Sequence, residues 1–286
     1  MELAVAAEGI SAVAIQEAID EVAAGGGGRV VLPKADVLLD RGLELRSGVE
    51  LCGQGRGTVL RKGPGRVWPL SGYHNASAAA PFPPSSLPHS SCCAQYGMCD
   101  APLESVAGLE VGMTVSVHDS RTHGGFYETF ARVLWVDEEE RFVGLDHGIE
   151  ADCASPHHWA TRRPTLHPGS PAGLTPLTDS ADESPCLTTS HPVVFGHHIS
   201  NATLRALHIE GSASQQDKKM GGCRGGSVYF AKSTHVNIAD VTEADYDGEG
   251  LSFQMCRDIT IDGCRFDRNT GNGLHPGAGS TNCSFT

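Results

Sequence analysis

Three carboxylates at alternate positions, Asp245, Asp247 and Glu249, stand in the glycine-flanked stretch DYDGEGLSFQ, directly before an apolar segment that we expect to be a strand. Paired carboxylates can divide the general-acid and the nucleophile or base roles of glycoside hydrolysis. Clustered carboxylates can instead hold Ca²⁺, a cation that prefers oxygen ligands. The plainer alternative is a solvated polar turn. Three acids in one turn repel one another unless a cation or a base is near, which favours a functional site.

The residues around this turn repeat with a period of 23. Val228, Leu251 and Leu274 occupy equivalent places, since 251 − 228 and 274 − 251 both equal 23. A β-rich, glycine-punctuated unit of this length without a helical pattern is typical of a solenoid. One such coil holds about three short strands, so we expect a parallel β-helix over residues 193–286.

The period converts the sequence into columns, because equivalent residues of neighbouring coils stack about 4.8 Å apart. Alternation along the strand places Val228, Leu251 and Leu274 inside. The outward column is then Tyr229, Ser252 and His275, followed by a column that contains Gln254. Three predicted pairs join the acidic turn to the next coil: Asp245 with Arg268, Asp247 with Thr270, and Glu249 with Asn272.

These columns supply the candidate site. The sequence predicts four catalytic candidates: Asp247, Glu249, His275 and Arg268. It predicts three residues that bind sugar rings by stacking or hydrogen bonding: Tyr229, Gln254 and Asn272. Asp245 and Asp247 are the candidate ligands of a Ca²⁺ ion. Arg268 is expected either as the ion-pair partner of Asp245 or as a base.

The N-terminal segment predicts one amphipathic helix. Ser11 is the expected N-cap, and Ile15, Ala18, Ile19 and Val22 form one apolar face before a run of four glycines ends the helix. Short apolar strands separated by Gly, Pro and Ser turns follow.

The segments AIQEAIDEVAAGGGGRVVLP, LELRSGVELCGQGRGTVL and SFQMCRDITIDGCRFDRNTGNGLHPGAGS resemble the pectate-lyase-like superfamily. The resemblance covers roughly residues 10–62 and 193–286. It implies an all-β chain forming a right-handed parallel β-helix with an N-terminal capping α-helix. It also implies action on carbohydrate and an extracellular or cell-surface location.

Within this superfamily, the layout around Glu249 is similar to that of polygalacturonases, but the signature differs. Gly248 and Glu249 stand where those enzymes carry an Asp pair, and Asn272 stands where they carry a His, so we do not expect that activity to transfer. Pectate lyases imply Ca²⁺-binding Asp residues and an Arg base, a chemistry that Arg268 beside Asp245 allows.

Three regions are expected along the chain. Residues 1–63 form the helix and first coils. Residues 64–192 form a loop-rich insertion with a small β subdomain at 103–151. Residues 193–286 form regular coils, and since the chain stops within a repeat, we expect further coils to follow.

Composition limits the partners. The 286 residues carry a net charge of −13 without a run of Lys or Arg, so nucleic acid is not expected. No apolar stretch is long enough to span a membrane, and no signal-peptide pattern is visible. We predict a polysaccharide-degrading enzyme, a glycoside hydrolase or a polysaccharide lyase, acting on an extended acidic glycan. The alternative is a non-catalytic glycan-binding or structural module. The sequence does not indicate the oligomeric state.

Overall fold

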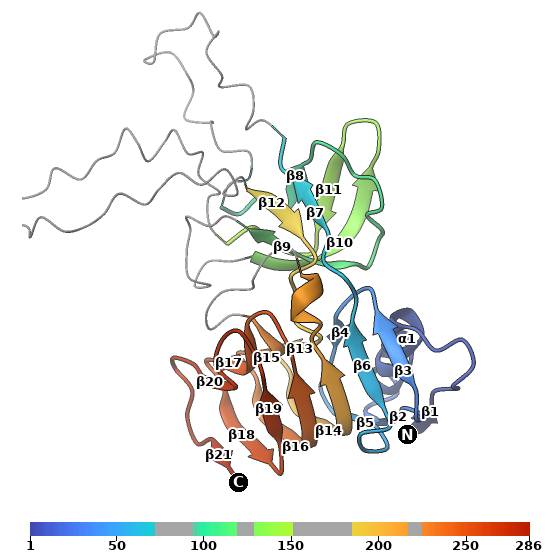
Figure 1. Cartoon of the computed structure of the whole chain (residues 1–286), viewed down its shortest axis with the longest axis vertical. Coiled ribbons are helices and arrows are strands. Elements are labelled where there is room, and N and C mark those ends of the chain that lie inside the picture. Colours follow the sequence, from blue (N-terminus) through green and yellow to red (C-terminus); the bar gives the residue numbers. More distant parts are fainter. Residues whose placement is uncertain (72–93, 95, 119–128, 151–184, 217–224) are drawn as a thin grey trace, which may run out of the picture. The chain divides into compact units, whose positions relative to one another are not determined.

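The computed structural model describes residues 1–71, 94, 96–118, 129–150, 185–216 and 225–286 (Figure 1). The two stretches of the expected loop-rich insertion at 72–93 and 151–184 lie outside the described residues. The chain divides into two compact units. Unit 1 comprises residues 1–66 and 189–286, and unit 2 comprises residues 67–188.

Unit 1 is a stack of parallel strands in two sheets. The first sheet has five strands: β4 (Leu43–Glu44), β13 (Val194–His197), β15 (Gly226–Ala231), β17 (Glu249–Gln254) and β20 (Leu274–Pro276). The second sheet has ten strands: β1 (Glu2–Ala4), β2 (Gly28–Val31), β3 (Asp36–Leu39), β5 (Val49–Cys52), β6 (Val59–Lys62), β14 (Ser200–Glu210), β16 (Thr234–Ala244), β18 (Arg257–Asp262), β19 (Arg265–Asp267) and β21 (Ser284–Phe285).

The predicted register of the coils is confirmed. Val228 of β15 pairs with Leu251 of β17, which pairs with Leu274 of β20, all in parallel. Val228 and Leu251 are completely buried, as alternation requires of the inner face. The strand pairing is therefore that of a parallel β-helix with a 23-residue coil. The handedness stays a prediction.

Single residues in the left-handed region form one corner of the coil. Ala206 in β14, Asp240 in β16 and Gly263 after β18 all have φ between 53° and 59°. Their spacing follows the coils, since 263 − 240 is 23 and 240 − 206 is 34, one period plus an 11-residue insertion. Each such residue turns a strand through a corner, so β14 and β16 each contribute to two sides of the coil.

The helix α1 spans Ala12–Ala24 and begins as the sequence predicts. The Ala14 amide donates to the Ser11 hydroxyl oxygen at 3.2 Å, and the helix ends before Gly25. Its buried face contains the predicted residues Ile15 and Ile19 and packs against strands β1 to β5. A short 3₁₀ helix, η2, follows β14 at Ala213–Gln215.

Unit 2 is an antiparallel sheet with its own core. Its strands, in sheet order, are β7 (Val67–Pro69), β12 (Cys186–Thr188), β9 (Thr114–His118), β10 (Thr129–Asp137), β11 (Phe142–Leu145) and β8 (Asp100–Pro102). Every helix in the described part of the chain falls short of the length and apolarity that a membrane crossing requires.

Candidate functional site

The acidic turn connects β16 to β17, and all three of its predicted pairs with the next coil are present. Arg268 Nε donates to Asp245 Oδ1 at 2.9 Å, and Thr270 Oγ1 donates to Asp247 Oδ1 at 2.8 Å. The backbone amide of Asn272 donates to Glu249 Oε2 at 2.5 Å. Each pair is 23 residues apart in sequence, so the coil register alone explains which residues meet.

Glycine allows the two coils to approach closely at Glu249. A Cβ on Gly271 would lie 2.7 Å from the Gly248 carbonyl oxygen and 2.9 Å from Glu249 Cδ. Any other residue at position 271 would therefore push the Glu249 carboxyl away from the Asn272 amide. The glycine fixes this carboxylate in one place.

Glu249 and His275 form a carboxylate–imidazole pair across two neighbouring coils. Glu249 begins β17 and is only 6% exposed, and its Oε1 lies 3.4 Å from Nδ1 of His275 on β20. The His275 side chain is 33% exposed, yet its Nδ1 is buried. The exposed part of the ring is therefore the part away from the carboxylate. The 3.4 Å contact is at ion-pair distance, and Nδ1 has no hydrogen bond among the described residues. A ring placed in this way can exchange a proton with a ligand through its outer nitrogen.

Asp247 is half-buried and lies on the same turn as Glu249. One of its oxygens accepts the Thr270 hydroxyl. Asn272, which follows on the next coil, has an exposed side chain. Both residues are thus accessible beside the Glu249–His275 pair.

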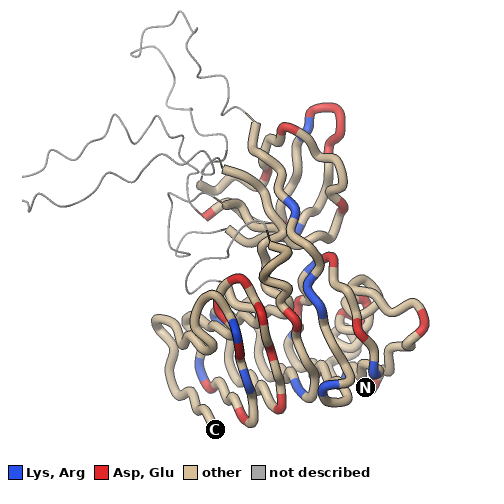
Figure 2. The backbone as a smooth tube through the Cα atoms, in the orientation of Figure 1, with Lys and Arg blue, Asp and Glu red and all other residues tan. Residues whose placement is uncertain are grey.

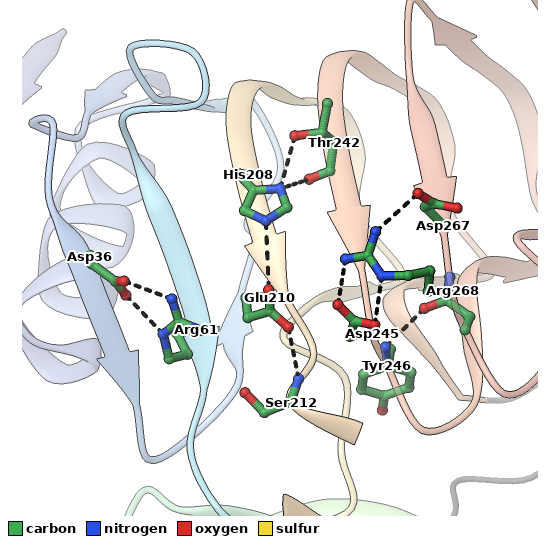
Figure 3. A network of polar contacts seen from close by, with 11 residues as sticks. Asp36, Arg61, His208, Glu210, Ser212, Thr242, Asp245, Tyr246, Asp267 and Arg268 are labelled. Atoms are coloured by element: carbon green, nitrogen blue, oxygen red, sulfur yellow. Dashed lines mark hydrogen bonds and ion pairs between the residues drawn. The ribbon is translucent and has the colours of Figure 1, made fainter. Parts of the chain in front are cut away.

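Arg268 is an ion-pair partner and is unsuited to act as a base. Its guanidinium holds both carboxylate oxygens of Asp245, at 2.9 and 2.5 Å, and also contacts Asp267 at 3.1 Å (Figure 3). The hydrogen bond and the charge of Asp245 raise the pKa of Arg268 above its ordinary value. A guanidinium so stabilised keeps its proton, so the pairing alternative is the one that the geometry supports.

The described residues do not fit the expected Ca²⁺ site as they are arranged. Both oxygens of Asp245 are held by Arg268, while Asp247 has a separate partner in Thr270. No group of three or more His, Cys, Asp or Glu side chains in the described residues is placed to hold a metal ion. Binding of Ca²⁺ stays a prediction, and no step below depends on it.

The structure corrects the expected exposure of Tyr229 and Gln254, which are 5% and 7% exposed. Tyr229 lies edge-on to the ring of His197 with centroids 5.6 Å apart. Gln254 lies against Gly277, where a Cβ would fall 1.8 Å from its Nε2. Alternation places these side chains outside the coil, as predicted, but both are buried. An open stacking platform at Tyr229 is therefore not present.

Glu243, which the sequence reasoning missed, lies on the inner side of the same turn. Its neighbours in the column are Ile209 and Phe266, so a carboxyl group occupies an apolar position. Its Oε2 accepts a 2.8 Å hydrogen bond from Asn269 Nδ2, and a Cβ on Gly250 would lie 2.8 Å from that oxygen. Burial raises the pKa of Glu243 to about 8, and interactions with Asn269 and Ser227 oppose this increase.

The columns contained a signal that could have identified Glu243. Position 243 falls one period before Phe266 and 34 residues after Ile209, both apolar. A single acid in an otherwise apolar inward column indicates a buried and perturbed group.

Comparison of the sequence with protein-family models and with curated proteins finds no match. Comparison with solved structures does find similar chains. Parallel β-helix proteins of the pectate-lyase-like superfamily are among them.

A candidate glycosyl hydrolase from Parabacteroides merdae is similar at 13% identity and a TM-score of 0.46, over 100% of this chain and 94% of that one. The A-module of the mannuronan C-5 epimerase AlgE4 from Azotobacter vinelandii is similar at 14% identity and 0.41, over 97% and 57%. The family 28 exopolygalacturonase from Yersinia enterocolitica is similar at 12% identity and 0.38, over 100% and 48%. The chain thus spans about half of the latter two, and its function is inferred from its own site.

Proposed function

We propose that the chain is a carbohydrate-active β-helix protein that degrades an extended, acidic polysaccharide. The observation that supports this best is the Glu249–His275 pair, in which a buried carboxylate lies 3.4 Å from a partly exposed imidazole on the next coil. Asp247 and Asn272 lie beside the pair on the same two coils.

His275 is the proposed proton-transfer group. Glu249, itself anchored by the Asn272 amide, faces Nδ1 at 3.4 Å, and the outer nitrogen of the ring is the one proposed to meet a bound sugar. A positioned imidazole can accept the proton next to a uronate carboxyl group in β-elimination, or transfer a proton in hydrolysis. In hydrolysis, His275 protonates the leaving oxygen while Asp247 acts as the nucleophile or activates the attacking water. The exposed Asn272 side chain provides hydrogen bonds to sugar hydroxyls.

Location follows from the substrate. An extended acidic polysaccharide is met outside cells, so we propose an extracellular or cell-surface role, as the resemblance to the superfamily implies.

The test is turnover of a panel of acidic and neutral polysaccharides, followed by reducing-end release and by the ultraviolet absorbance of unsaturated products. We expect turnover of an acidic polysaccharide to be detected by one of these two readouts. We expect His275→Asn and Glu249→Gln each to lower kcat, the former by about 10²- to 10⁴-fold. Assays with added Ca²⁺ and with a chelator test the metal separately.

The matched control is His235→Asn, because His235 is an exposed histidine that also lies near a carboxylate, with Nε2 3.3 Å from Asp258. We expect this variant to retain wild-type turnover. Equal activity of His275→Asn and His235→Asn would refute the assigned role. Sugar binding without turnover of any polysaccharide would favour the non-catalytic glycan-binding module instead.

A further inference from the structure

A pocket of about 290 Å³ lies in unit 1, and neither Glu249 nor His275 belongs to its lining. It is lined by Arg56, His208, Thr242, Glu243, Ala244, Arg265, Asp267 and Arg268. Three neighbouring strands supply most of its wall, since His208 of β14 pairs with Thr242 of β16, which pairs with Arg265 of β19. Figure 3 shows His208, Thr242, Asp267 and Arg268 in this region.

The pocket wall carries three arginines in a chain of net charge −13. The three arginines, Arg56, Arg265 and Arg268, share the lining with two carboxyl groups, Asp267 and Glu243. Glu243 adds little negative charge at neutral pH, because burial raises its pKa to about 8. Asp245, which pairs with Arg268, and Glu210, whose Oε2 lies 3.9 Å from His208 Nε2, bring the ionised carboxylates around the wall to three, equal to the number of arginines. Figure 2 shows that acidic and basic residues are likewise interspersed over unit 1.

Arg56 is the cation in this wall that is free to receive a ligand. Arg265 and Arg268 both donate to Asp267, at 2.7 and 3.1 Å. The exposed Arg56 side chain has no hydrogen bond or ion pair with any residue that the structure describes. A guanidinium with an open donor edge binds planar or tetrahedral oxyanions through paired hydrogen bonds.

The rest of the wall offers fixed polar groups suited to hydroxyls. His208 Nδ1 lies 2.9 Å from Thr242 Oγ1 and 3.0 Å from the Thr242 carbonyl oxygen, which holds the ring in place. The volume lies near the small end of the range for ligand pockets, about 300 to 1,000 Å³, so it suits a single sugar ring rather than an oligosaccharide.

We propose that this pocket binds one anionic sugar residue, with Arg56 holding its carboxylate or sulfate group and the His208–Thr242 side facing its hydroxyls. The pocket is joined to the acidic turn through the Arg268–Asp245 ion pair. The idea that the bound sugar belongs to the polysaccharide substrate rests on the proposed function, whereas binding of the free sugar does not.

Isothermal titration of the full chain with D-glucuronate, D-glucose 6-sulfate and D-glucose tests the proposal at low ionic strength. We expect an anionic sugar to bind with a Kd on the order of 1 mM, and D-glucose to bind at least about ten-fold more weakly. Binding of both anionic sugars or of one supports the proposal, and the pattern shows whether carboxylate or sulfate is preferred. Equal binding of D-glucose, or no binding of either anionic sugar, would overturn it.

Variants assign the binding to the pocket. Arg56→Ala should raise the Kd of the anionic sugar by about ten-fold through loss of charge-assisted hydrogen bonds. Arg257→Ala is the control, because Arg257 is also exposed and lies outside the pocket lining. An unchanged Kd in Arg56→Ala would refute the assignment, as would inorganic sulfate that binds as tightly as D-glucose 6-sulfate.

Glu249→Gln separates this proposal from the proposed function. We expect it to bind D-glucuronate as the wild type does, even though its turnover is impaired. If the protein binds the anionic sugar but degrades no polysaccharide, the sugar-binding proposal stands and only the proposed enzymatic function is overturned. Loss of sugar binding in Glu249→Gln with Arg56→Ala unaffected would place the sugar at the acidic turn and overturn the pocket.

Discussion

The buried Glu243 makes a sharp prediction about stability and pH. The carboxyl is 1% exposed and faces Asn269 and Ser227, while Glu210 and Asp245 are the acidic groups near it. Replacing it with Gln keeps the shape and an oxygen that can accept the 2.8 Å hydrogen bond from Asn269 Nδ2. The substitution removes only the ability to ionise, so the variant isolates the free energy of placing a charge inside the coil.

The direction of the pH dependence of stability follows from whether the folded or the unfolded state binds the proton of Glu243. In the folded protein the pKa of Glu243 is about 8, against 4.5 for the ordinary group. Between these values the folded state holds a proton that the unfolded state has lost, so the free energy of unfolding falls as pH rises. The slope is about 1.4 kcal/mol per pH unit, which gives a maximum near 5 kcal/mol over the whole window.

Urea unfolding at pH 5.5 and 7.5 tests this. The free energy of unfolding of Glu243→Gln minus that of the wild type should increase by about 3 kcal/mol between the two pH values. Far-ultraviolet circular dichroism is the suitable signal, because all three tryptophans lie within residues 67–188 and do not report on unit 1. Glu139→Gln, in an exposed turn of unit 2, is the control and should give a constant difference. A constant difference for Glu243→Gln as well would refute the reasoning.

Two further predictions concern unit 1. Burial lowers the pKa of Lys62 to about 7 from 10.5, so between these values the unfolded state binds more protons and the free energy of unfolding rises with pH. Lys62→Met should remove about 1.4 kcal/mol of this gain per pH unit, measured by urea unfolding between pH 7.5 and 9.5. Equal pH slopes of the free energy of unfolding in the variant and the wild type would contradict this account. A Cβ on Gly211 would lie 2.4 Å from Tyr246 Cα, so Gly211→Ala should lower the free energy of unfolding by about 1 to 3 kcal/mol. Gly57→Ala, which meets only the flexible side chain of Lys34, should change it by less than about 1 kcal/mol, and equal losses in the two variants would show that the contact with Tyr246 is unimportant.

The coil register was predictable because it is local. A 23-residue period is visible in the sequence, and parallel stacking makes residues one period apart neighbours. This is why the sequence alone predicts the partners of Asp245, Asp247 and Glu249. Exposure was not predictable in the same way. Alternation places Tyr229 and Gln254 outside the coil, but whether an outward side chain is buried depends on packing beyond that coil.

The pocket lined by Arg56 and His208 could not be predicted from the sequence for a related reason. Arg56 reaches the wall from the first coils, where Val59 of β6 pairs with His208 of β14. These residues are 149 apart, since 208 − 59 spans the whole of unit 2. No period connects them, so the register between the early and late coils follows only from the folded chain. Contacts within the repeat could be predicted, whereas contacts across the insertion could not.

The acidic turn shows how the next coil changes the chemistry of an isolated motif. Three acids in one turn predict a nearby cation or base, because like charges repel. Each carboxylate instead has its own partner one period later: Arg268 for Asp245, the Thr270 hydroxyl for Asp247, and the Asn272 amide for Glu249. These contacts offset part of the repulsion within the turn, and the remaining oxygen of Glu249 lies 3.4 Å from His275 Nδ1. The same stacking that stabilises the coil therefore converts a cluster of charges into an oriented carboxylate–imidazole pair.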